Sequence, residues 1–192
     1  GETIFHQGDP GDALFIVASG SVKVVLPSDD GAEPAIVAIL GRGEFFGELA
    51  LLDGAPHSAT AVAVEQTETL VLHRGAFLEL IDLDAGLRRA LLASLATEIR
   101  RLTGHVEDLH FLDLPGRLAS RILRLAMSAG ARTGEARIGW PYTQSELAGM
   151  IGGSRQSVNR LLADLTEQGL VRLERDHLVV PDLDRLAETI ER

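Results

Sequence analysis

The stretch AGLRRALLASLATEIRRLTGHVEDLHFL, residues 85–112, decides how the rest of the chain is organised. Its apolar side chains recur at steps of three and four residues, and we call these six the heptad seam: Leu92, Leu95, Ile99, Leu102, Val106 and Leu109. A helix that packs on a globular core carries a broader apolar face than this one. A narrow seam fits a second helix, most simply the same helix of another copy, so the pattern predicts a homodimer. The alternative is an amphipathic helix packed within its own chain.

The sequence on the two sides of this helix differs in character. Residues 3–73 are short apolar runs separated by turn residues, which predicts strands, and Asp29-Asp30-Gly31 is a hairpin signal among them. Many short strands with glycine punctuation predict a small sandwich or barrel. Beyond residue 112 the patterns are mostly helical. Gly104 lies inside the long helix, where glycine costs about 1 kcal/mol relative to alanine and would let two backbones approach closely.

Composition narrows the function classes. The 192 residues are 45% hydrophobic, enough for one large or two small domains, and carry a net charge of -10. There are no cysteines, which excludes disulfides, cysteine-held iron–sulfur clusters and thiol catalysis. No apolar run approaches the roughly 18 residues of a membrane span, and no signal segment opens the sequence. We therefore expect a cytoplasmic protein without a membrane partner. An acidic protein of this kind binds nucleic acid only through a local basic patch.

Residues 43–60, GEFFGELALLDGAPHSAT, form a motif within the strand-rich part. A glycine followed by a short helical turn presents free backbone N–H groups, which can hold a phosphate. The carboxylate of Glu48, directly after Gly47, could accept hydrogen bonds from a sugar hydroxyl. The alternative is a structural turn in which Glu48 faces solvent.

The C-terminal part begins with a helix that Asp113 caps and that runs to about residue 128. Three of its charged side chains are expected to lie in solvent: Arg117, Arg121 and Arg124. Thr143-Gln144-Ser145-Glu146 is a capping box that opens the next helix. A turn at Gly152-Gly153 and a cap at Ser154 then begin a further helix, so the pair predicts a helix-turn-helix.

The second helix of this pair carries polar residues near its N-terminal end, off its apolar face: Arg155, Gln156, Asn159 and Arg160. That end of a helix-turn-helix enters the major groove of DNA. The alternative is a solvated polar face. Residues 170–173 and 178–180 predict a hairpin, which is typical of a wing beside the helices.

The chain resembles, essentially from end to end, the cyclic-AMP receptor protein / fumarate-nitrate regulator family of bacterial transcription factors. The motifs that carry the resemblance are residues 46–50 with 58–60, residues 111–119 and residues 152–160. The resemblance implies an α+β protein with three parts. Residues 1–84 would form a jelly-roll-like β-roll that binds cyclic nucleotides, residues 85–112 a dimerisation helix, and residues 113–192 a winged helix-turn-helix.

The resemblance also implies a ligand site formed by Phe46, Gly47, Glu48, Leu49, Ala50, His57, Ser58, Ala59 and Thr103. In the family an arginine–serine pair holds the phosphate, whereas this chain has His57-Ser58. Arginine is always charged and forks around phosphate, but histidine is mostly neutral near neutral pH. Glu98 stands where cyclic-AMP-responsive members carry another arginine, and Leu102 replaces a hydroxylated residue. Three alternatives therefore stay open for this site: it binds cyclic AMP, it binds another small molecule, or it binds no ligand.

The implied DNA-binding residues are Thr143, Gln144, Ser154, Arg155, Gln156, Ser157, Asn159 and Arg160. The implied partners are an inverted-repeat operator in double-stranded DNA, a second copy of the chain and RNA polymerase. A β-roll sensor that regulates a partner protein, or a ligand-independent transcription factor, are the alternatives. An enzyme is not expected, because no nucleophile–base pair or metal constellation converges, and the histidines make no metal-spaced pair.

Overall fold

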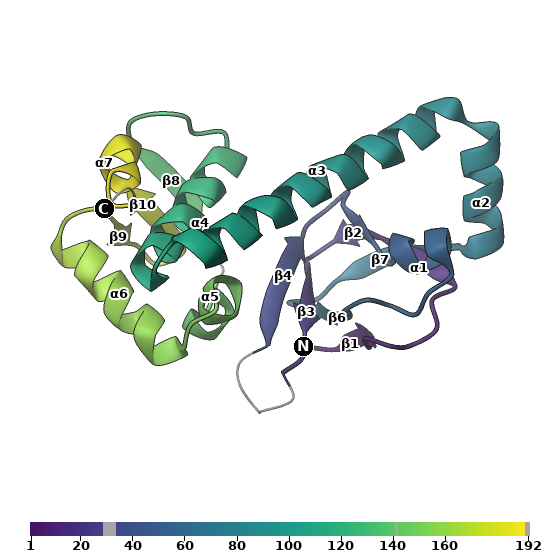
Figure 1. Cartoon of the computed structure of the whole chain (residues 1–192), viewed down its shortest axis with the longest axis horizontal. Coiled ribbons are helices and arrows are strands. Elements are labelled where there is room, and N and C mark those ends of the chain that lie inside the picture. Colours follow the sequence, from purple (N-terminus) through teal and green to yellow (C-terminus); the bar gives the residue numbers. More distant parts are fainter. Residues whose placement is uncertain (29–33, 141, 191–192) are drawn as a thin grey trace. The chain divides into compact units, whose positions relative to one another are not determined.

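The computed structural model describes residues 1–28, 34–140 and 142–190. The chain divides into two compact units, Gly1–Ile99 and Arg100–Arg192, so the long helix α3, Ala85–Phe111, begins in the first and ends in the second (Figure 1). Each unit combines helices with antiparallel strands, which confirms the α+β class. The hairpin predicted at Asp29-Asp30-Gly31 lies outside the described residues. Within the described chain, no helix is long and apolar enough to cross a membrane.

The first unit contains two antiparallel sheets. One has the order β1-β6-β3-β4, with bounds Thr3–Phe5, Thr60–Ala63, Val22–Leu26 and Ala35–Leu40. The other has the order β5-β2-β7, with bounds Phe45–Phe46, Ala13–Ser19 and Glu68–His73. The predicted strand-rich roll is thereby confirmed. Its core includes buried Val17, Val22, Phe46 and Ala61, with Phe5 and Phe15 packed against them.

Three helices accompany the sheets: α1, Glu48–Asp53; α2, Arg74–Leu83; and the first part of α3. A second apolar cluster joins Leu14, Leu51, Phe77 and Leu91, with Leu95 partly buried against it. Leu91 lies beside the heptad seam and not in it. Helix α3 therefore packs on its own unit through Leu91, which lies off the heptad seam, and through one seam residue, Leu95.

The other five seam residues are exposed in the single chain. Their exposed fractions are 60% for Leu92, 64% for Ile99, 40% for Leu102, 54% for Val106 and 46% for Leu109. Burying apolar surface is the main favourable term in folding and association, so such a row of exposed aliphatic side chains is typical of an interaction surface. The alternative of a helix packed only within its own chain accounts for Leu91 and Leu95 but not for these five.

The second unit is built on α4, Leu114–Ser128, and on the helix pair α5, Gln144–Ile151, and α6, Arg155–Glu167 (Figure 1). An antiparallel sheet of order β8-β10-β9 and the short helix α7 complete it, with bounds Ala136–Gly139, His177–Val180, Arg172–Leu173 and Leu183–Ala187. The pairing of β9 with β10 confirms the predicted wing hairpin. Buried aliphatic side chains from α4, α5, α6 and β10 form the core: Leu118, Ile122, Leu147, Val158 and Leu178.

The predicted helix starts are confirmed. The carboxylate of Asp113 accepts from the backbone N–H of Gly116 at 2.9 Å, and Ser154 Oγ accepts from Ser157 N–H at 3.1 Å. Thr143 and Glu146 form the reciprocal capping box. Each of these motifs satisfies backbone N–H groups that a helix leaves without an internal partner.

The prediction that the arginines of α4 lie in solvent is wrong. Arg117 donates from Nη1 to the carbonyl oxygen of Ile151 at 2.9 Å, and Arg124 donates from Nη2 to both carboxylate oxygens of Asp108 at 2.8 Å. Arg121 is partly buried between them. The physical reason is that α4 packs on two sides: its aliphatic face meets the core, and its arginine face meets the end of α3 and of α5.

Gly104 makes a contact within its own chain that the sequence did not indicate. A Cβ at this position would lie 2.6 Å from Nη1 of Arg124, and the Gly104 carbonyl oxygen accepts from Arg124 Nη2 at 3.2 Å. The missing side chain thus leaves room for the guanidinium of Arg124 beside the backbone of α3.

Candidate ligand pocket and nucleic-acid interface

The motif of residues 43–60 contains a backbone turn at Gly47. Its φ is +86°, and a Cβ there would lie 3.0 Å from the carbonyl oxygen of Ala13, so both conformation and space require glycine. Helix α1 follows directly. Of the predicted ligand residues, Phe46, Ala50 and Ala59 have buried side chains, whereas Leu49 and Ser58 are exposed. Phe46 stacks on Phe15 in the core, with ring centroids 5.3 Å apart. Phe46, Ala50 and Ala59 therefore shape the site from within.

Glu48, the first residue of α1, does not face open solvent. Burial raises the pKa of its carboxyl, the backbone N–H of the same residue opposes this, and the nearby carboxylate of Glu98 adds to the rise. The carboxylate of Glu98 therefore lies near enough to that of Glu48 to act on its pKa. Neither can attract an anionic ligand, but either can accept hydrogen bonds from hydroxyl groups.

His57 is turned into an aromatic cluster. Its side chain is buried, and its ring stacks on Phe5 with centroids 3.6 Å apart and planes inclined by 6°. The ring lies against the backbone of Gly11 and Gly47, because a Cβ at either glycine would come within 3.1 and 3.5 Å of its Cε1. Burial lowers the pKa of His57, and Asp9 and Asp12 oppose that effect. Burial thus disfavours the charged form of this imidazole, and a histidine lacks the guanidinium fork of an arginine.

The first unit ends at Ile99 within α3, so Thr103, which comes later in the same helix, belongs to the second unit. Its side chain is exposed. Within the first unit the structure brings together Gly47, Glu48 and His57, with Ser58 beside them in sequence. The aromatic partner Phe5 was not predicted from the sequence. Its separation of 52 residues from His57 leaves no local signal for the contact.

The helix-turn-helix positions its polar residues through two local contacts. Gly152 ends α5 with φ +69°, a left-handed conformation that favours glycine. The side-chain amide of Gln144 donates to Oδ1 of Asn159 at 2.9 Å, which joins the start of α5 to α6. A groove of about 430 Å³ lies beside this contact and is lined by Thr143, Gln144, Ser145 and Arg155.

The two faces of α6 differ sharply. Val158, Leu162 and Leu165 are buried, while Arg155, Gln156, Asn159 and Arg160 are exposed. The structure therefore brings Thr143, Gln144 and Arg155 to one groove and leaves the remaining polar residues of α6 accessible in its first two turns. Ser145 is the one lining residue that was not predicted as a DNA contact, although it stands inside the capping motif.

A β-roll joined through a long helix to a winged helix-turn-helix defines a DNA-binding regulator with a sensor domain. Two family models match: the cyclic nucleotide-binding domain over residues 1–84, and the Crp-like helix-turn-helix domain over residues 116–189. The chain belongs to the cyclic-AMP receptor protein / fumarate-nitrate regulator family of transcription regulators, whose members are not enzymes.

Several relatives match most of the chain. A CRP-like cAMP-activated global transcriptional regulator of Mycobacterium tuberculosis is 37% identical over 188 residues, covering 97% of this chain and 84% of the relative. The cyclic AMP receptor protein of Thermus thermophilus is 40% identical over 173 residues, covering 90% and 77%. The solved structure of FixK2 from Bradyrhizobium japonicum has the same fold, with a TM-score of 0.84 at 24% identity, covering 97% of this chain and 91% of that one.

Proposed function

We propose that this regulator acts as a homodimer through the heptad seam, binds an inverted-repeat operator in the cytoplasm, and acts on RNA polymerase there. The exposed seam supports the dimer, because five aliphatic side chains of one helix are left uncovered. A two-fold dimer carries one α6 per subunit. Its half-site centres should therefore lie about 34 Å apart, one turn of the duplex, so that both helices meet the same face.

The proposed sequence-specific DNA binding rests on one observation: α6 buries its apolar face and exposes polar side chains along its N-terminal half. Arg155 and Arg160 have the donor fork that matches O6 and N7 of guanine. Gln156 stands between them in a position where the family usually carries a glutamate, an acceptor suited to the amino group of cytosine. Glutamine donates and accepts, which suits N6 and N7 of adenine. We infer that the flanking guanines are retained and that the base between them shifts toward adenine.

The experiment is a selection of binding sites from random duplexes, run in parallel on the natural protein and on Gln156→Glu. The expected result is an inverted repeat with the same flanking guanines in both, and a change at the base that Gln156 reads. If the two proteins select the same half-site with equal stringency, position 156 reads no base. If neither selects any site, the β-roll acts through a partner protein instead.

We infer that the β-roll is the effector site, with the backbone of Gly47 and the carboxylate of Glu48 directed to a sugar phosphate. Cyclic AMP is the first ligand to test, because relatives that match over most of the chain are named as cAMP-activated. Its binding should be weak at neutral pH, since burial disfavours the charged form of His57 and the carboxylates of Glu48 and Glu98 repel a phosphate. A bound phosphate would raise the pKa of His57, so affinity should increase as pH falls.

One alternative keeps the DNA-binding role and removes the ligand. It is favoured by His57 itself, which stands where the family carries its phosphate-binding arginine and whose ring is stacked on Phe5. In that case the natural protein binds its operator with the same affinity with and without cyclic nucleotides. A DNA titration at constant ionic strength, with and without saturating cyclic AMP, separates the two.

A further inference from the structure

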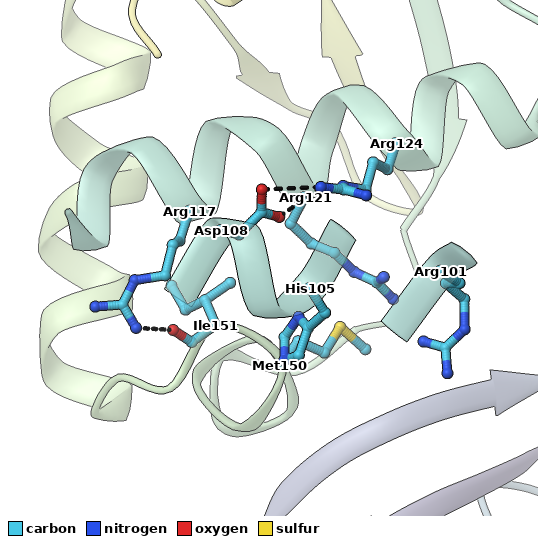
Figure 2. A pocket seen from close by; sticks show the side chains of 8 residues that line it. All are labelled: Arg101, His105, Asp108, Arg117, Arg121, Arg124, Met150 and Ile151. Atoms are coloured by element: carbon cyan, nitrogen blue, oxygen red, sulfur yellow. Dashed lines mark hydrogen bonds and ion pairs between the residues drawn. The ribbon is translucent and has the colours of Figure 1, made fainter. Parts of the chain in front are cut away.

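A small cavity lies in the C-terminal unit. It has a volume of about 30 Å³ and is enclosed by the last turns of α3, by α4 and by the end of α5 (Figure 2). One water position takes about 10–15 Å³ by this kind of measure, so the cavity has room for roughly two. It can receive one small ion but not a nucleoside.

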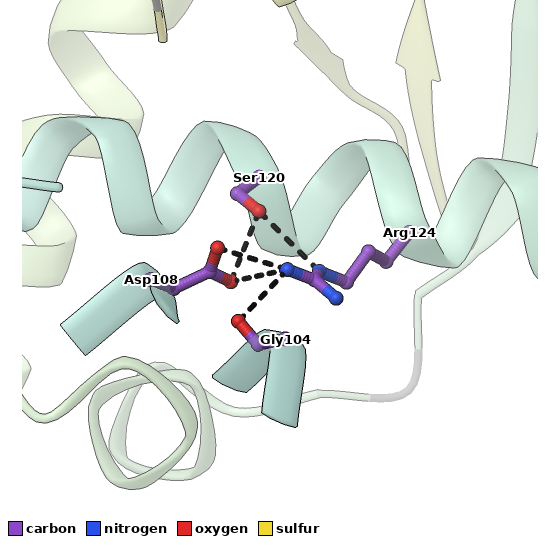
Figure 3. Close-up of polar contacts among 4 residues, drawn as sticks. All are labelled: Gly104, Asp108, Ser120 and Arg124. Carbon is purple, nitrogen blue, oxygen red and sulfur yellow. Dashed lines mark hydrogen bonds and ion pairs between the residues drawn. The ribbon is translucent and has the colours of Figure 1, made fainter. Parts of the chain in front are cut away.

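The lining of this cavity contains more arginines than carboxylates. Four arginines line it, and Asp108 is its only lining carboxylate among the described residues. Asp108 is fully engaged: Arg124 Nη2 lies 2.8 Å from both of its oxygens, and Ser120 Oγ donates to it at 3.1 Å (Figure 3). Arg124 Nη2 also reaches the carbonyl oxygen of Gly104. The one negative charge is therefore neutralised within the wall.

Arg121 is left without a carboxylate partner among the described residues, although it lines the cavity and its guanidinium extends past His105 toward Arg101 in the view of Figure 2. The Nε atoms of Arg121 and Arg117 are both buried and have no hydrogen-bond partner in the described part of the chain. Burial lowers the pKa of Arg121, and Arg101 and Arg124 add to that, while Tyr142 opposes it. A buried cation without an anion is costly, and proteins pair such groups with an acceptor.

We propose that this cavity binds a small oxyanion of the phosphate class, held by the guanidinium of Arg121, with His105 and the charge of Arg101 beside it. Guanidinium groups match the oxygens of such anions in a two-pronged geometry. The bound anion joins α3, α4 and α5, the first helix of the DNA-binding pair, and it stabilises the C-terminal unit. This role is independent of any ligand in the β-roll.

The first test is phosphate binding to the full chain by calorimetry and thermal unfolding, with potassium chloride at equal ionic strength as reference. We expect saturable binding of one phosphate per protomer and a rise in unfolding temperature that chloride does not give. Arg121→Met should weaken phosphate binding at least tenfold, and Arg121→Lys by less. Arg132→Met is the matched control, because Arg132 bonds to the carbonyls of Met127 and Ala131 outside the cavity.

A second arm uses the natural protein, so it does not depend on whether the variants fold. Phosphate should shift the NMR signals of the Nε–H groups of Arg117 and Arg121 at lower concentrations than it shifts those of exposed arginines. A non-specific duplex in place of phosphate shows whether a DNA backbone phosphate gives the same shifts, which distinguishes the two sources of the anion. Equal effects of phosphate and chloride, or undiminished phosphate affinity in Arg121→Met, would overturn the proposal.

The pH dependence gives an independent readout at His105. Burial lowers the pKa of this imidazole; Arg101, Arg121 and Arg124 act in the same direction, and Asp108 opposes them. An anion in the cavity should raise that pKa, so its affinity should increase as pH falls through the titration of His105. Sulfate is the probe here because its own charge is constant in this range. A pH-independent sulfate affinity would contradict the placement beside His105.

Discussion

The dimer seam can be tested with a single substitution, Leu102→Asp. Full burial of an aliphatic side chain of this size stabilises by about 1.5–3 kcal/mol, and five seam residues keep 40–64% of their surface exposed in the single chain. Burying the remainder therefore contributes about 1 kcal/mol for each side chain, or roughly 10 kcal/mol for both copies. The loss of rotational and translational freedom on association, about 4–15 kcal/mol, opposes this gain. A dimer that depends on the seam has little stability in reserve.

Aspartate at position 102 removes about 1 kcal/mol of burial from each copy and adds two carboxylates whose desolvation costs several kcal/mol each. The total exceeds about 5 kcal/mol, which is more than three orders of magnitude in the dissociation constant. Sedimentation velocity at micromolar concentration should then show monomer. Leu87→Asp is the matched control, because Leu87 is also 40% exposed on α3 but lies off the seam. An unchanged dimer in Leu102→Asp, or an equal loss in Leu87→Asp, would refute the seam as the interface.

Four further outcomes are expected. His57→Arg should strengthen cyclic-AMP binding at neutral pH by about one to a few kcal/mol, measured by calorimetry, and tight binding that ignores the change would contradict the role assigned to His57. Burial holds the pKa of Glu48 in the folded state above its value in the unfolded chain. The stability that the protonated carboxyl contributes is therefore full below about pH 4 and is lost as pH rises through the raised pKa. Glu48→Gln should accordingly raise the unfolding temperature at neutral pH, and the difference from the natural protein should disappear in acid. Asp108→Asn should destabilise the fold by about 1–3 kcal/mol, because it leaves Arg124 without its carboxylate; an unchanged denaturation midpoint would contradict this. Arg155→Ala should weaken operator binding by about 1–3 kcal/mol and blur one position of the site, as measured by competition with single-base variants.

The parts that the sequence predicted well are those with local causes. The capping box at Thr143 and Glu146, the cap at Asp113 and the glycine turn at Gly152 each involve residues within a few positions of one another. Their geometry depends on backbone N–H groups of the same helix end, so a single stretch of sequence contains all the partners. The long helix was predicted within one residue of its observed end, because its apolar spacing persists over its whole length.

The parts that were missed depend on contacts between distant segments. His57 meets Phe5 across 52 residues, and the helical spacing around Leu91 does not mark it as the residue that packs α3 into its own unit. The arginines of α4 are a mixed case. Their spacing of four and three residues places them on one helix face, which was visible, but only the packing of α4 against α3 and α5 turns that face inward.

The β-roll and the C-terminal cavity differ in the charge that each presents to an anion. In the β-roll, a phosphate held as we propose would meet the imidazole of His57, whose burial disfavours its charged form, and the carboxylates of Glu48 and Glu98. In the C-terminal cavity, the proposed anion would meet Arg121, which has no carboxylate partner among the described residues. If the two sites are energetically separate, the gain in cyclic-AMP affinity from His57→Arg should be the same within about 0.5 kcal/mol in the natural background and in Arg121→Met. A larger difference would mean that binding of the anion between α3, α4 and α5 is energetically coupled to binding of the β-roll ligand. The arginines of the C-terminal cavity would then supply, beside the DNA-binding helices, the positive charge that the β-roll lacks at His57.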